Sequence, residues 1–318
     1  LILEKGKIPD DSLAEFSPEM GNILPTTTMV GDLTNEGTLE KIWNYIQAEE
    51  VGRIGVYGMG GVGKTTIMRE IYNRLREEVK KNGNRFDDVF WVTVSQKSSI
   101  EKLQANIAEG IGFQLSDQDV MRRAGKLSDA LKERKRFVLI LDDLWEPFSL
   151  EDIGIPIPTK ENGCKLILTT RSFHVCRSME TEKEVQVKVL SEKESWDLFV
   201  SKVGSSTGVL VDEKIRKVAE EVAKECDGLP LALVTVGRAL RKVNKEDWQN
   251  ALTALRGSTS NVAGMEEKVF SRLRFSYDRL KDDETRSCFL YSALYPEDHE
   301  IEAKELIEYW MWEGLLGK

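Results

Sequence analysis

Short apolar runs alternate with amphipathic stretches through the first 190 residues of the chain. Near-continuous apolar runs bounded by polar residues are typical of parallel strands that are buried on both faces. Stretches with apolar residues three or four positions apart are typical of helices that cover such a sheet. The pattern predicts strands over residues 53–59, 87–95, 136–144, 165–171 and 184–190, and helices over residues 37–49, 64–79, 100–112 and 119–134.

The strand signal stops after Leu190, and only helical patterns follow. Ser191 is followed three residues later by Glu194, which is the capping-box signature of a helix N-terminus. Pro230 falls in the first turn of a largely apolar helix, where its missing N–H costs little. The second half of the chain is therefore predicted to be helical, with helices over residues 191–203, 212–228, 228–240, 245–255, 267–280, 284–294 and 302–313.

Strands that alternate with helices, followed by helices alone, indicate an α/β fold with a parallel sheet and a separate helical part. A length of 318 residues is consistent with two or three domains. We expect a linker over residues 1–24, an α/β domain over 25–190, a helical subdomain over 191–283 and a further segment over 284–318.

The charge balance, the apolar runs and the cysteines of the chain argue against several classes of protein. The chain has 45 Lys and Arg against 54 Asp and Glu, and its net charge of -9 argues against broad, direct nucleic-acid binding, which leaves a local basic patch as the alternative. No apolar run approaches the length of a membrane span, and no secretory leader opens the chain. The four cysteines are far apart, so we expect small buried side chains in a reducing cytosol and no zinc site. Because the sequence does not begin with Met, we expect a piece of a longer protein.

One segment is unusually rich in glycine. The stretch GMGGVGKTT fits the pattern G-x-x-x-x-G-K-[ST], in which backbone N–H groups surround phosphates, a lysine reaches the β- and γ-phosphates and a hydroxyl binds Mg²⁺. A predicted strand precedes it and a predicted helix follows, whose dipole favours an anion at this end. A plain glycine-rich turn is the alternative. We predict a phosphate-binding loop formed by Gly58, Gly60, Gly61, Val62, Gly63, Lys64, Thr65 and Thr66, with Thr65 as a Mg²⁺ ligand.

A second group of candidate residues follows the apolar run of the third predicted strand. In open α/β sheets, ligands bind beyond the carboxyl ends of the strands. We expect Asp142 to hold Mg²⁺, directly or through water, and Asp143 to orient or deprotonate an attacking water. We expect Thr169, Thr170 and Arg171, at the end of the next strand, to point toward a γ-phosphate, whose charge Arg171 would sense or stabilise. The alternatives are an acidic turn that only ends the strand and a surface arginine.

Six motifs follow one another with family-like order and spacing: GMGGVGKTT, FDDVFWVTVSQ, RFVLILDDLWE, CKLILTTRS, CDGLPLAL and CFLYSALYPEDHEI. Together they resemble the NB-ARC nucleotide-binding domain of plant disease resistance proteins of the NBS–leucine-rich-repeat class, which are intracellular immune receptors and STAND P-loop NTPases. The resemblance runs from about Thr28 to the end of the sequence. Trp145, directly after LDDL, resembles the subclass with an N-terminal coiled coil.

This resemblance implies roles for individual residues. Val30 and Gly31 match the segment that lines the adenine, although Asp32 stands where the family usually has arginine. Pro230 matches the proline that packs on the adenine, and Arg171 matches the sensor arginine. The resemblance also implies that a P-loop NTPase sheet is followed by an ARC1-like helical subdomain and by the start of an ARC2-like winged-helix subdomain over residues 284–318.

The implied function is a molecular switch in a plant innate immune receptor of the cytoplasm. ADP would bridge the α/β and helical subdomains in the off state, and ATP with Mg²⁺ would favour an oligomerising on state that triggers defence. Hydrolysis would at most be slow. The implied partners are an upstream coiled coil, downstream leucine-rich repeats and further copies of the receptor, with membrane contact only through other domains. A turnover ATPase of the AAA type and a nucleotide-regulated DNA-binding regulator are the alternatives.

Overall fold

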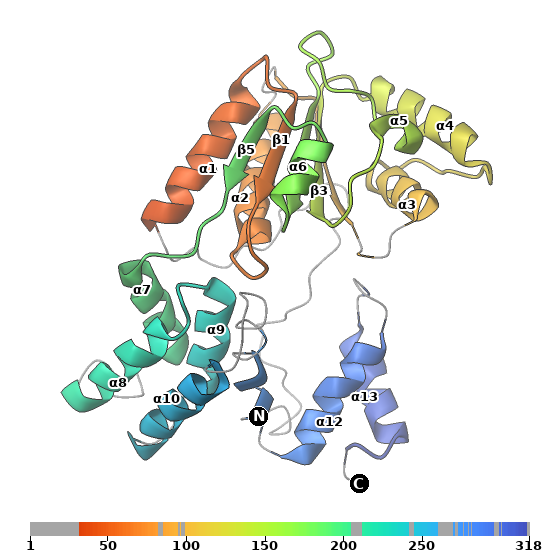
Figure 1. Ribbon diagram of the computed structural model, residues 1–318. Coiled ribbons are helices and arrows are strands. Elements are labelled where there is room, and N and C mark those ends of the chain that lie inside the picture. Colours follow the sequence, from red (N-terminus) through yellow and green to blue (C-terminus); the bar gives the residue numbers. More distant parts are fainter. Residues whose placement is uncertain are drawn as a thin grey trace.

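The computed structural model describes residues 32–81, 85–94, 96, 99–204, 212–241, 245–259, 270, 273–275, 277–278, 280, 282–295, 299 and 301–316. Five parallel strands form the centre of the α/β part (Figure 1). Their order across the sheet is β2-β3-β4-β1-β5, so the first strand lies between two later ones. The strands are β1 (Arg53–Tyr57), β2 (Asp88–Thr93), β3 (Phe137–Leu144), β4 (Lys165–Thr170) and β5 (Lys183–Gln186).

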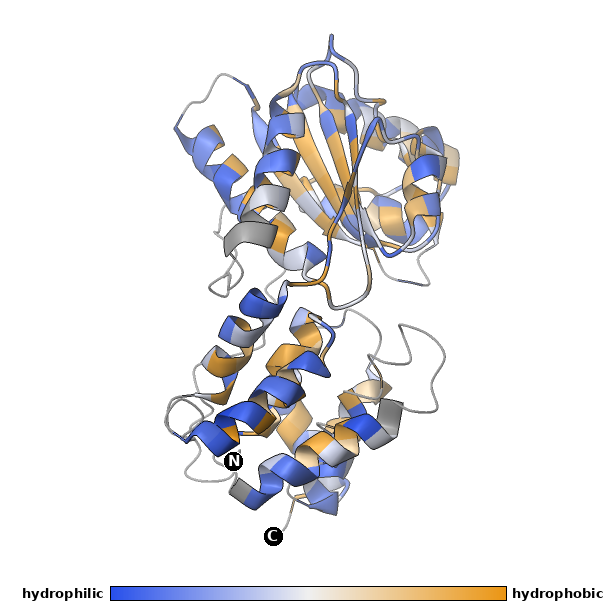
Figure 2. Cartoon of the chain, turned by 60° about the vertical axis from the view of Figure 1, so that its left-hand side comes forward, coloured by the Kyte–Doolittle hydropathy of each residue, from blue (hydrophilic) through white to orange (hydrophobic). Residues whose placement is uncertain are grey.

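Alternate side chains of β3 enter two apolar cores, one on each face of the sheet. Val138 and Ile140 join the core that includes α1 and α2, whereas Leu139 and Leu141 join the core that includes α3 to α6. Because side chains alternate along a strand, burial on both faces requires an apolar run. Figure 2 shows the apolar strands between helices with hydrophilic outer surfaces. These helices are α1 (Asp32–Gln47), α2 (Lys64–Lys80), α3 (Ile100–Gly110), α4 (Val120–Glu133), α5 (Leu150–Ile153) and α6 (Phe173–Ser178).

Only helices follow the sheet in the described part of the second half. The first begins with the predicted capping box between Ser191 and Glu194. Phe199 and Trp248 are buried against each other, with ring centroids 6.3 Å apart, and belong to the same core as α1 and α2. The helices are α7 (Glu192–Val203), α8 (Glu213–Lys224), α9 (Pro230–Ala239), α10 (Lys245–Thr259), α12 (Asp283–Tyr291), the short 3₁₀ helix η2 (Ser292–Leu294) and α13 (Ala303–Trp312).

The predicted fold class is confirmed, while several boundaries were wrong. The fifth strand ends at Gln186 and not at residue 190. The helix predicted to reach residue 228 ends at Lys224, because Asp227 (φ 50°) and Gly228 (φ 70°) adopt left-handed conformations. The short helices α5 and α6 were not predicted. The linker over residues 1–24, the positions Val30 and Gly31, and half of the helix predicted over 267–280 lie outside the described residues.

The four cysteines are buried with free thiols, as predicted. None of the helices in the described part of the chain combines the length and apolarity that crossing a membrane requires.

Gly154 offers a test of the packing between α4 and α5. It has φ 94°, and a Cβ there would lie 2.2 Å from the carbonyl oxygen of Ala124 in α4. We expect Gly154→Ala to lower the free energy of unfolding by about 2 kcal/mol or more, because strain and overlap add. Gly125→Ala is the control: the site is exposed within α4 with no atom within 4 Å, so we expect a gain of about 0.5–1 kcal/mol. Urea unfolding of both variants measures the difference, and equal effects would contradict this packing.

Candidate functional site

The glycine loop leads from the end of β1 into the start of α2. Its first residue is fixed to the sheet, because the N–H of Gly58 donates to the carbonyl of Thr170 at 3.2 Å. Gly61 (φ 76°) and Gly63 (φ 100°) take left-handed conformations that glycine adopts most readily. Gly63 is the N-cap of α2, and the first turn has neither a side-chain cap nor an acidic residue. The loop therefore offers an anion the first N–H groups of α2 and the positive end of its dipole.

Lys64 brings a single positive charge to the inside of the loop. Its Nζ donates to the carbonyl oxygens of Gly58 at 2.8 Å and of Met59 at 3.2 Å. Burial lowers the pKa of Lys64, whereas the nearby carboxylate of Asp143 raises it. The ammonium group is thus held at the loop before any ligand binds.

Asp142 connects three elements of the site. The hydroxyl of Thr65, in α2, donates to its Oδ2 at 3.0 Å, and the hydroxyl of Thr169, in β4, donates to its Oδ1 at 2.6 Å. The side chain is 3 % exposed, and this burial raises its pKa, while the two hydroxyl bonds lower it. The site therefore places a carboxylate that lacks a full counter-charge beside a threonine hydroxyl.

These two groups fit Mg²⁺, which prefers oxygen ligands. In the described residues no three His, Cys, Asp or Glu side chains gather into a metal site of their own. A Mg²⁺ ion near Thr65 and Asp142 would therefore take further ligands from phosphate and water, as this ion commonly does.

Asp143 and Arg171 lie on the same side of the loop. A register irregularity between Leu141 and Leu144 interrupts the pairing of β3 with β4, and Asp143 adopts φ 56° within it. Its N–H donates to the hydroxyl of Thr169 at 2.9 Å, and its carboxylate lies 3.6 Å from the guanidinium of Arg171. The bulge thus turns two consecutive carboxylates toward different partners.

The ring of Trp145 holds the same guanidinium. Its centre is 4.1 Å from Cζ of Arg171, a distance at which a cation–π contact is favourable. A Cβ added to Gly60 would lie 3.5 Å from Nη1 of Arg171, so the arginine lies beside the glycine loop. Sequence reasoning used Trp145 only to assign a subclass, and its contact with Arg171 was missed.

The helical part touches the loop through the first turn of α9. The N–H of Leu231 donates to the carbonyl of Gly61 at 3.2 Å, and a Cβ on Gly61 would lie 2.7 Å from Cβ of Leu231. The predicted adenine contact Pro230 is the first residue of α9 and so lies beside this contact. Leu231 was not predicted as a site residue, although it belongs to the GLPLAL motif.

Contacts therefore bring together the glycine loop, β3, β4 and the start of α9. The roles of the site residues remain predictions, and Val30 and Gly31 lie outside the described part of the chain. Thr169 was predicted only to lie near a γ-phosphate, and the bridge that its hydroxyl forms between Asp142 and the backbone of Asp143 was not predicted. The only signal for it in the sequence was a threonine pair at the end of a predicted strand.

The NB-ARC domain family matches residues 35–208 of the chain. The chain is 40% identical over 315 residues to the disease resistance protein RPS5 of Arabidopsis thaliana, covering 97% of this chain and 34% of that protein. It is 42% identical over 298 residues to the disease resistance protein UNI of Arabidopsis thaliana, covering 92% of this chain and 32% of that protein. The chain spans about a third of the length of the curated relatives it matches.

One solved structure shows the same fold at low sequence identity, and a second structure is similar to this chain. The Drosophila ORC bound to DNA is 15% identical with a TM-score of 0.50, covering 89% of this chain and 88% of that one. A STAND protein with a tetratricopeptide repeat sensor from Pyrococcus horikoshii is 17% identical with a TM-score of 0.49, covering 94% of this chain and 38% of that one.

The effect of the buried charge of Asp142 on stability can be tested in protein without nucleotide or metal. Asn can retain both hydroxyl contacts without a buried charge, so we expect Asp142→Asn to raise the free energy of unfolding at pH 7 by about 1 kcal/mol. Because burial raises the folded-state pKa of Asp142, its ionisation destabilises the wild-type fold as the pH rises above the ordinary range of an aspartate. The difference in the free energy of unfolding between variant and wild type should therefore grow with pH.

Urea unfolding of nucleotide-free and metal-free protein between pH 4 and pH 8, about the range in which such a group titrates, measures this difference. Asp129→Asn is the control, since this carboxylate of α4 is 81% exposed and should change little. A variant that is less stable than wild type at every pH would show that the charge of Asp142 supports the fold.

Proposed function

The chain belongs to the NB-ARC domain family, and on this premise we propose that it is the ADP- and ATP-binding switch of a plant disease resistance protein. We propose a P-loop nucleotide-binding domain over residues 25–190, an ARC1-like subdomain over 191–283 and the start of an ARC2-like winged helix over 284–318. A linker over residues 1–24 would precede them. Nucleotide would bind where the first two of these domains meet.

One observation carries this proposal: the glycine loop is in contact with the helical part. The backbone bond from Leu231 to Gly61 places the start of α9 on the loop that would hold the phosphates. The N–H of Leu190 also donates to the carbonyl of Gly228 at 2.9 Å, which joins the end of the sheet domain to the turn before α9. A nucleotide at the loop would therefore contact both parts when they are closed.

Each side chain of the site then has a role in nucleotide binding. The N–H groups of the loop and Lys64 would hold the β-phosphate, and Thr65 with Asp142 would bind Mg²⁺, which neutralises phosphate charge. Arg171 would meet the γ-phosphate and so distinguish ATP from ADP. Asp143 would orient water for a slow hydrolysis that resets the switch.

A ligand shifts a conformational equilibrium only through its different affinity for the two states. ADP would favour the closed state because closure creates part of its site. The γ-phosphate would attract Arg171, which already pairs with Asp143 and stacks on Trp145. ATP would thereby replace the contacts of Arg171 with Asp143 and Trp145 by a contact with the γ-phosphate. This exchange would favour an open state that oligomerises. The coiled coil, the leucine-rich repeats and the signalled defence response belong to this proposal for the whole receptor.

The loop is tested by Lys64→Ala. We expect ADP affinity to fall by about 10- to 100-fold, the usual effect of losing a hydrogen bond to a charged group. The measurement is titration with a fluorescent ADP analogue, together with chromatography of the nucleotide that the denatured protein releases. Lys188→Ala, an exposed lysine of the segment after β5, is the control and should retain ADP. Undiminished affinity in Lys64→Ala would exclude the glycine loop as the site. Steady, rapid release of phosphate by the wild type would instead indicate a turnover ATPase.

The junction is tested by Leu231→Asp. Leu231 is 36% exposed, so the fold tolerates the change, but a charge would weaken its packing on Gly61. We expect ADP to dissociate about tenfold faster, within the usual range of coupling between two sites. A chase of the fluorescent analogue with unlabelled ADP measures the rate. Met121→Asp in α4, at an 85% exposed site, is the control. Equal rates in both variants would mean that the sheet domain alone retains ADP.

A further inference from the structure

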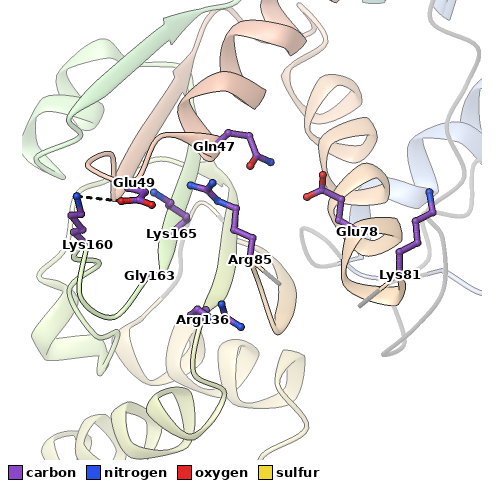
Figure 3. A pocket seen from close by; sticks show the side chains of 9 residues that line it. All are labelled: Gln47, Glu49, Glu78, Lys81, Arg85, Arg136, Lys160, Gly163 and Lys165. Atoms are coloured by element: carbon purple, nitrogen blue, oxygen red, sulfur yellow. Dashed lines mark ion pairs between the residues drawn. The ribbon is translucent and has the colours of Figure 1, made fainter. Parts of the chain in front are cut away.

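A second pocket lies at the opposite edge of the sheet from the glycine loop (Figure 3). Arg85 precedes β2, Arg136 precedes β3 and Lys165 opens β4, so the pocket adjoins the amino ends of these parallel strands. The ends of α1 and α2 and the segment before β4 complete it. It has a volume of about 670 Å³ and is lined by Gln47, Glu49, Glu78, Lys81, Arg85, Arg136, Lys160, Gly163 and Lys165.

The lining is basic, although the protein as a whole is acidic. Five of the nine residues are cationic and two are acidic, whereas the whole chain has a net charge of -9. Like charges repel one another when they are gathered in one concave site, so such a lining favours a bound anion.

Three of the five cations are matched by carboxylates. Ion pairs join Arg136 to Asp87 at 3.1 Å, Lys160 to Glu49 at 3.2 Å and Lys81 to Glu77 at 3.6 Å. Among the residues that the structure describes, no carboxylate lies within ion-pair distance of Arg85 or Lys165. The pocket therefore retains two positive charges that no ion pair offsets.

Lys165 is the more unusual of the two. Its side chain is 3% exposed, and its Nζ donates to the carbonyls of Ala48, at 2.6 Å, and Val51, just after α1. An ammonium group has three donors, so a third remains for a ligand. Burial lowers the pKa of Lys165, and the guanidinium of Arg85 lowers it further, whereas the carboxylates of Glu182, Glu49 and Glu50 raise it.

We propose that this pocket is a second anion site, which binds a small phosphate-bearing molecule of several negative charges through Lys165 and Arg85. A planar guanidinium beside a point-like ammonium is a combination suited to phosphate oxygens. The volume is that of a small-molecule site. The site is separate from the glycine loop and does not depend on the proposed switch. A bound anion would also fix the end of α1 against β4, because Lys165 joins them.

Inorganic tripolyphosphate is the probe. Calorimetric titration into protein saturated with ADP, in magnesium-free buffer at low salt, should show one further molecule bound per chain. Arg85→Gln combined with Lys160→Gln should weaken it by about tenfold or more, since charge-assisted contacts are lost at an accessible surface. Arg216→Gln combined with Lys217→Gln removes the same two kinds of charge from exposed positions of α8 and should change the affinity less than about twofold, because salt and distance screen them.

Two further variants distinguish binding at this pocket from binding at the glycine loop. Lys64→Ala should still bind tripolyphosphate with wild-type affinity even if ADP binding fails, because the second site lies at the other edge of the sheet. Lys165→Met should lose binding, with its fold checked by circular dichroism; if it does not fold, the Arg85 and Lys160 variant decides.

Three results would overturn the proposal. Displacement of tripolyphosphate by ADP would place it in the glycine loop. Equal weakening by the α8 control would show a general charge effect without a site. Binding of citrate as tight as that of tripolyphosphate would show that the pocket does not select phosphate.

Discussion

The buried carboxylate of Asp142 is the interaction on which the geometry of the site depends. It lies on β3, while its two hydroxyl partners come from α2 and from β4. A single side chain thus fixes the helix after the glycine loop relative to two neighbouring strands. Removing a carboxylate from water is unfavourable unless hydrogen bonds or a cation offset the loss. The hydroxyls offset part of it, and in the proposed function a divalent cation would offset the remainder.

Two glycines determine how closely the sheet domain and the helical part approach each other, because glycine has no side chain. Gly61 and Gly228 both have positive φ angles, and a Cβ at either would lie within 3 Å of an atom of the segment it packs against. The backbone of the loop can therefore approach α9 closely enough for a direct hydrogen bond. Any larger residue at these two positions would hold the sheet domain and the helical part further apart.

Much of this arrangement could be predicted from the sequence. The apolar runs of β1, β3 and β4 identified buried parallel strands, and the glycine pattern together with the strand ends placed the loop near Asp142 and Arg171. Local pattern was sufficient because a parallel sheet brings all carboxyl ends to one edge.

Contacts that depend on tertiary register could not be predicted. The bond between Leu231 and Gly61 and the bridge formed by Thr169 require knowledge of which segments meet. The basic pocket was missed for the same reason: Arg85 and Lys165 are ordinary charged positions in sequence, and only the folded sheet places them together. The boundary error at α8 came from a turn whose left-handed residues, Asp227 and Gly228, are not all glycine.

The order of the strands has a consequence for synthesis of the chain. Ile54 of β1 pairs with Ile167 on one side and Lys183 on the other, so β1 keeps at least one open edge until both later strands have been made. At a translation rate of about 5–20 residues per second, this wait lasts roughly 6–26 s. An apolar strand with an open edge can pair with another chain during that time. The strand that precedes the glycine loop is therefore also a point of aggregation risk on the ribosome, and a chaperone that shields it would affect how much of the protein a cell accumulates.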